Sequence, residues 1–94
     1  MIPKNDHKLS ATDEKIADKL TLMIVEELEK NAIARIYRYN TAFREDICRV
    51  VGKEFKKNDY YVALDFVPNG FRSLIVSKTP IPHPTGRLVS IEFL

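Results

Sequence analysis

The sequence has few of the residues on which disulfides, metal sites and phosphate-binding loops depend. Its 94 residues include one cysteine, Cys48, which excludes an intrachain disulfide and a zinc site made of several cysteines. The three glycines stand far apart, so the chain contains no glycine-rich phosphate loop. It also lacks tryptophan, and it has no apolar run of about 18 residues, the length expected of a membrane-spanning helix. We therefore expect no metal and no cofactor.

The composition is that of one small folded domain. Hydrophobic residues make up 45% of the chain and charged residues 30%, and both values are ordinary for globular proteins. Residues 1–11 are mostly polar and lack the apolar centre of a signal peptide. We expect a flexible N-terminal segment over residues 1–11 and a single domain over residues 12–94. A single cysteine suits a reducing compartment, so we expect the protein in the cytoplasm.

Two helices are predicted in the first two thirds of the chain. The first begins near Thr12, whose hydroxyl can accept from free backbone amides, and the second covers residues 42–57 after a cap at Asn40-Thr41. Within the second helix Gly52 costs about 1 kcal/mol relative to alanine, which indicates a close approach to a neighbouring element. Apolar residues at steps of three and four give each helix one stripe for burial. The stripes are Ile16, Leu20, Met23, Ile24 and Leu28 in the first helix, and Phe43, Ile47, Val50, Val51 and Phe55 in the second.

The strongest short-range signal is a β-hairpin around Asn69-Gly70. Two β-rich runs, residues 60–67 and 71–78, flank this pair, and Asn-Gly tolerates the positive φ angles of a type I′ turn. With Asn69-Gly70 as the loop, Phe66 pairs with Ser73. One face of the hairpin is then predicted to lie under the helices and carries Tyr60, Val62, Leu64, Phe66, Phe71 and Ile75. The other face is predicted to be partly exposed and carries Tyr61, Asp65, Arg72, Leu74, Val76 and Lys78.

The remaining segments complete a small sheet. Residues 32–39 continue the helical spacing of the first helix, but they also alternate like a strand, and Asn31 as a stop signal favours the strand. Residues 79–86 are rich in proline and predict an extended connector, and residues 88–93 alternate again as a last strand. The expected fold is α+β. Two helices pack on one face of a small, mostly antiparallel sheet of three or four strands with a C-terminal β-hairpin.

Few residues offer catalytic chemistry. His7 and His83 lie in the predicted tail and in the proline-rich connector, without a visible partner. Cys48 has no nearby base to activate its thiol, which favours a structural role. Glu27 and Glu54 fall in the middle of the two helical stripes, where converging carboxylates could hold a metal or act as acid and base. A structural interpretation is better, because both lie near the C-terminal ends of their helices, where the stripe can leave the core, and either could pair with an arginine. We therefore expect no catalytic residue, and a minimal hydrolase or nuclease is a distant third hypothesis.

The charges are unevenly distributed along the chain. The net charge is only +2, but residues 30–57 contain eight basic and three acidic residues, whereas residues 13–29 contain six acidic and two basic ones. Basic side chains can neutralise phosphates and tyrosines can stack on unpaired bases, although a solvated helix face has the same composition. RNA or DNA binding is therefore the alternative function, through Arg35, Tyr37, Arg38, Arg44, Arg49, Lys53, Lys56 and Lys57.

Apolar residues outside the two stripes favour a protein partner. Leu22 and Val25 point away from the main stripe of the first helix, among acidic residues, and apolar groups framed by charge often mark interaction surfaces. Edge strands of a small sheet offer another route to pairing. The first hypothesis is thus a non-catalytic interaction module, a small regulatory or accessory protein that binds another protein or forms a homodimer. Its predicted partner-binding residues are Leu22, Val25, Arg72, Leu74 and Lys78.

Overall fold

The computed structural model describes residues 9–38 and 43–94, and this part of the chain forms two helices and four strands. The first helix, α1 (Ala11–Lys30), begins one residue before the predicted start. Its cap is Ser10 and not Thr12, because the backbone N–H of Asp13 donates to Ser10 Oγ at 3.1 Å. The helix ends at Lys30 with Asn31, the stop signal favoured from the sequence, as its C-cap, and Leu20, Ile24 and Leu28 of its stripe are buried. In the described ranges, no helix is long and apolar enough to cross a membrane.

The second helix, α2 (Glu45–Lys57), begins three residues later than predicted. The predicted cap at Asn40-Thr41 lies outside the described residues, and Arg44 occupies the N-cap position without a side-chain hydrogen bond to the helix end. Gly52 is buried, and a Cβ at this position would lie 3.0 Å from Val62 Cγ1 and 3.0 Å from Leu94 Cδ1. The close approach predicted from this glycine is therefore confirmed.

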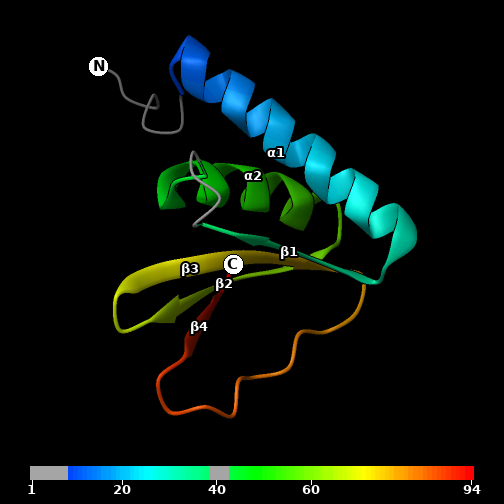
Figure 1. Cartoon of the computed structure of the whole chain (residues 1–94). Coiled ribbons are helices and arrows are strands. Elements are labelled where there is room, and N and C mark those ends of the chain that lie inside the picture. Colours follow the sequence, from blue (N-terminus) through cyan, green and yellow to red (C-terminus); the bar gives the residue numbers. More distant parts are fainter. Residues whose placement is uncertain (1–8, 39–42) are drawn as a thin grey trace.

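The four strands form one antiparallel sheet in the order β1-β3-β2-β4. They are β1 (Ile33–Tyr37), β2 (Tyr61–Val67), β3 (Gly70–Ser77) and β4 (Ser90–Phe93). The ambiguous tract 32–39 thus contains a strand, as favoured from its alternation. Both helices lie on the same face of the sheet (Figure 1), which confirms the predicted α+β fold. We call the face of the sheet that is turned away from the helices the far face.

The hairpin between β2 and β3 exists, but its loop differs from the prediction. Val67 pairs with Gly70, so the two loop residues are Pro68 and Asn69. Proline holds φ near −65°, and of the non-glycine residues that the structure describes only Asp59 has a positive φ, so the loop cannot be of type I′. Gly70 supplies the left-handed conformation instead, with φ 125°.

A β-bulge then changes the register of β3. Phe66 pairs with Phe71 and Asp65 with Ser73, so Arg72 is an extra residue without a partner of its own in β2. The predicted pairing of Phe66 with Ser73 was wrong because the loop lies one residue earlier than expected. The predicted faces of Leu74 and Ile75 were wrong because the extra residue moves every following side chain to the opposite face. Leu74 and Val76 therefore face the helices and are 0% exposed, and Ile75 lies on the far face.

The far face is also covered. The segment between β3 and β4, residues 78–89, contains three prolines and runs beneath the sheet on the side opposite the helices (Figure 1); we call it the proline segment. Its His83 ring contacts the Phe93 ring edge to face, with centroids 5.0 Å apart. The far-face residues Ala63, Asp65, Ser73, Ile75 and Ser77 are consequently buried. The prediction of a partly exposed second face holds only near its margins, where Ile33, Tyr61 and Phe93 are exposed.

Candidate functional site

A buried carboxylate organises the far face. Asp65, on β2, is 2% exposed and accepts hydrogen bonds from side chains of three different positions in the sheet. Arg35 Nη1 on β1 donates to Oδ2 at 3.0 Å, Arg72 donates to the same oxygen from Nε at 3.2 Å and from Nη2, and Ser73 Oγ donates to Oδ1 at 2.5 Å. We call these four residues the Asp65 cluster.

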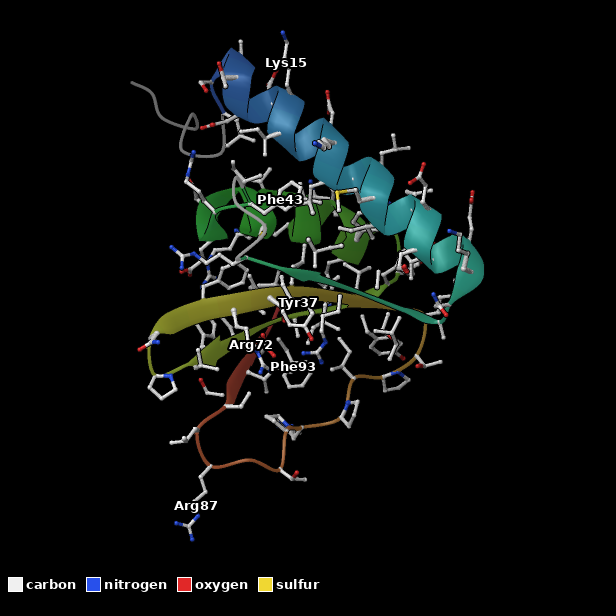
Figure 2. All side chains as sticks on the ribbon, in the orientation of Figure 1. Lys15, Tyr37, Phe43, Arg72, Arg87 and Phe93 are labelled. Carbon is white, nitrogen blue, oxygen red and sulfur yellow. The ribbon has the colours of Figure 1, made fainter. Side chains whose placement is uncertain are left out.

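The bulge explains how two neighbouring residues of β3 reach the same carboxylate. Regular alternation would send Arg72 and Ser73 to opposite faces, but both residues of a bulge oppose one residue of the partner strand. Figure 2 shows Arg72 on the underside of the sheet, whereas Arg87 of the proline segment points away from the domain.

The electrostatics keep Asp65 ionised. Burial raises the pKa of Asp65, but the hydrogen bonds from Arg72 and Ser73 and the charges of both arginines outweigh burial, so that its pKa lies below the ordinary value. The same hydrogen bond raises the pKa of Arg72. With one carboxylate and two guanidinium groups, the cluster carries a net charge of +1. Both arginines bring this charge to the surface, because the side chains of Arg35 and Arg72 are 37% and 35% exposed and that of Asp65 only 3%.

A cleft of about 420 Å³ opens beside the cluster, between the far face and the proline segment. Ile33, Arg35 and Ile75 line it on the sheet side, and Ile81 and Pro82 line it on the proline segment. The walls of the cleft are therefore mainly apolar, and the positively charged Asp65 cluster forms part of its lining. Such a surface can take an apolar group and an anionic group side by side.

The cleft borders β1, which is the outer strand of the sheet that the described residues form, and the outer edge of β1 has defined hydrogen-bonding groups. Lys78 N donates to Ala32 O at 2.9 Å, and Arg38 N donates to Arg72 O at 2.7 Å. Alternate residues of an antiparallel strand direct their main-chain groups to opposite sides. The even-numbered residues of β1 therefore bond to β3, and Ile33, Arg35 and Tyr37 direct their N–H and C=O groups away from the sheet.

A second hollow, of about 230 Å³, lies on the other side of the same edge. It is bounded by α1 and β1, and we call it the helix-side hollow. Its lining consists of Met23, Glu26, Glu27, Lys30, Arg35 and Ile36. Arg35 lines both spaces, so the outer edge of β1 has a hollow on each side.

The predicted partner-binding residues do not form one surface. Leu22 and Val25 are exposed on α1, with 57% and 39% of their surface accessible, but Arg72 lies on the opposite side of the sheet in the Asp65 cluster. Lys78 Nζ donates to Leu28 O at 2.7 Å near the end of α1. The inclusion of Leu74 was wrong, because the bulge places this residue in the core.

The predicted nucleic-acid residues are likewise divided. Arg35 and Tyr37 lie on the far face, whereas Lys53, Lys56 and Lys57 are exposed on α2 and Arg38 is exposed after β1. Arg44 bridges Asp13 and Asp46 at 2.9 and 3.0 Å, and Arg49 bridges Glu45 and Glu92, both at 2.7 Å. These pairs tie α2 to α1 and to β4, so two of the cations serve the fold.

The other residues considered for catalysis or metal binding each have local contacts of their own. Glu27 accepts from Asn31 Nδ2 at 3.3 Å, and Glu54 contacts Lys57 Nζ at 3.3 Å. Cys48 is 0% exposed, and burial raises the pKa of its thiol to about 12. Within residues 9–38 and 43–94, no group of three or more His, Cys, Asp or Glu side chains has the arrangement of a metal site.

Asp65 and Ile33 were missed as members of the site. Asp65 is the single carboxylate in the β-rich tract 60–78, among Val, Leu and Phe neighbours, and an isolated acid in such a strand signals a buried ionic partner. Ile33 gave no comparable signal, because its role depends on β1 being the outer strand.

Comparison of the chain with protein-family models, with curated proteins and with solved structures finds no match in any of the three.

Proposed function

We propose that this domain is a non-catalytic interaction module that binds an extended segment of another protein along the outer edge of β1. The observation that carries the proposal is the pair of hollows beside this edge, where Ile33, Arg35 and Tyr37 direct main-chain groups outward. A domain of this kind would act as a regulatory or accessory protein.

Strand addition fits both components of the site. An added strand takes its affinity from main-chain hydrogen bonds and its specificity from pockets for alternate side chains. The far-face cleft and the helix-side hollow are placed to receive the two sets of alternate side chains, since successive residues of a strand point to opposite faces.

Arg35 argues for a different protein and against a second copy of this chain. Antiparallel self-pairing of β1 with full overlap would be centred on Arg35, and it would place the two Arg35 side chains directly opposite each other. Like charges in directly opposed positions destabilise a pair of strands. A charged residue on an outer strand is also a common way to prevent edge-to-edge association.

The experiment is a peptide selection combined with a pair of edge variants. Random extended peptides selected on the whole chain are expected to shift the amide NMR signals of Ile33, Arg35 and Tyr37. Ile33→Pro removes one outward N–H without removing a bond to β3, and proline is tolerated at the first residue of an edge strand. Ile33→Thr is the matched control, because it changes the side chain and keeps the N–H.

Peptide binding is expected to fall about tenfold in Ile33→Pro, the effect of losing an interaction of about 1.4 kcal/mol, and to persist in Ile33→Thr. Peptides that bind equally to both variants, or that shift signals elsewhere, would contradict the proposal. Retention on heparin at low salt, lost when Lys53 and Lys56 become glutamate, would instead support the nucleic-acid alternative.

A further inference from the structure

We infer that the segment recognised by β1 is acidic and carries an Asp or Glu side chain directly opposite Arg35. The inference rests on the proposed function of the β1 edge and specifies the chemistry of its partner.

The register of an added strand places one partner side chain beside Arg35. Arg35 is the central residue of β1, between Ile33 and Tyr37, and its main-chain groups point outward from the sheet. In an antiparallel addition, the residue that exchanges both main-chain hydrogen bonds with Arg35 has its side chain on the same face, with the Cβ atoms about 5 Å apart. A carboxylate at this position can reach the guanidinium group.

Arg35 keeps hydrogen-bonding capacity for such a carboxylate. A guanidinium has five N–H donors, and Asp65 takes a hydrogen bond from Nη1 of Arg35. The charge of Asp65 is shared with Arg72, whose two nitrogens contact the same oxygen, so the Asp65 cluster keeps its positive charge. Because the Arg35 side chain is more than a third exposed, a partner can approach it without displacing Asp65.

The neighbouring positions extend the expected pattern. The partner residue opposite Ile33 meets a side chain that is 41% exposed and borders the apolar cleft, so an apolar residue is favoured there. The residues on either side of the acid point toward the helix-side hollow, which contains Glu26, Glu27 and Lys30. With Arg35, which also lines it, the hollow has two carboxylates and two cations, so its charges balance and the test peptides can have neutral residues at these alternate positions.

The test compares three end-blocked peptides of about nine residues, long enough to span β1 at ~3.4 Å per residue. They alternate threonine and valine and differ only in the central residue, which is Glu, Gln or Lys. Binding to the unaltered chain is measured by fluorescence polarisation, and NMR locates each peptide. The Glu peptide is expected to bind about tenfold more tightly than the Lys peptide, with Gln between them.

Variants then assign the preference to Arg35. Arg35→Gln is expected to abolish the difference between the Glu and Lys peptides, and Arg35→Glu is expected to reverse it. Lys53→Gln, which removes an exposed cation from α2, is the matched control and should change nothing. The comparison on the unaltered chain does not depend on the folding of any variant.

The outcomes separate the two proposals. Three peptides that bind β1 equally would overturn the acidic partner and leave strand addition at the edge intact. Failure of all three peptides to shift the amide signals of Ile33, Arg35 and Tyr37 would overturn both. A Glu preference that survives in Arg35→Gln would assign the recognition to another cation and refute the role given to Arg35.

Discussion

Replacing Asp65 with asparagine tests whether its charge, and not merely its shape, stabilises the far face. Asparagine has nearly the same shape, and its amide oxygen can accept from the arginines while its NH2 group donates to Ser73 Oγ, whose hydroxyl can rotate. The variant therefore removes the negative charge while the surrounding packing is retained.

The expected loss has two sources: the ion pairs of Asp65 with Arg35 and Arg72 become hydrogen bonds from a cation to a neutral amide, and the bond with Ser73 becomes a neutral one. A hydrogen bond to a charged group contributes about 1.5–3 kcal/mol and a neutral one about 0.5–1.5 kcal/mol. The side chains of Arg35 and Arg72 are 37% and 35% exposed, so water compensates part of the difference. We expect Asp65→Asn to lower the free energy of unfolding by about 1–2 kcal/mol, and Tm by about 5–15 °C for a domain of this size.

The pH dependence of this loss of stability distinguishes the charge of Asp65 from its shape more clearly than the loss at a single pH. Because the pKa of Asp65 is lower in the folded than in the unfolded chain, its ionisation stabilises the fold fully above the unfolded pKa of about 3.9. This stabilisation is lost as the pH falls through the folded pKa. Asparagine does not titrate, so the stability difference between the natural chain and Asp65→Asn should narrow below about pH 4.

Urea unfolding followed by circular dichroism, from neutral to acidic pH, measures this difference. Glu54→Gln is the control, because it neutralises a carboxylate in an exposed pair with Lys57 and should cost less than about 0.5 kcal/mol. A loss at neutral pH no greater than that of Glu54→Gln would refute the importance of the Asp65 charge. So would a loss that stays constant from neutral to acidic pH.

Two further predictions concern α2. The Cys48 thiol should resist a disulfide reagent at pH 8 in the folded protein and react once the chain is unfolded in denaturant, because burial raises its pKa to about 12; rapid reaction in the folded state would show that the thiol is accessible. Gly52→Ala should lower the free energy of unfolding by about 1 kcal/mol, because its Cβ would press on the buried Val62 and Leu74 side chains at 3.0 and 3.2 Å and this strain exceeds the gain in helix propensity. Urea unfolding measures this change, with Lys53→Ala as the exposed control on the same helix, and an increase in stability would show that the neighbouring side chains can yield.

Much of the fold was predictable because it depends on local periodicity. The stripe with Leu20, Ile24 and Leu28 identified α1, Asn31 marked its end, and the two β-rich runs around residues 68–70 identified the hairpin. The side chains of β3 that point toward the helices could not be predicted in the same way. The bulge at Arg72 leaves no trace in an alternating pattern, and it exchanges the faces of Leu74 and Ile75.

The candidate site was predictable only as separate residues. Arg35 and Arg72 were both selected from the sequence, but for different functions. They meet at Asp65 because β3 lies between β1 and β2, and a strand order of this kind is set by tertiary packing and not by local pattern. The cover of the far face depends likewise on long-range contacts, such as that between His83 and Phe93.

Residue 72 is an insertion in an otherwise regular ladder. Without it, the pairs Phe66–Phe71 and Asp65–Ser73 would be consecutive, and Leu74 would keep its place toward the helices. A chain shortened by this one residue could thus retain both the hairpin loop and the core while losing one of the two cations beside Asp65, which would make the cluster neutral. The presence or absence of one bulge residue in β3 would then change the charge that a domain of this architecture presents to a partner, while its hairpin loop and core stay the same.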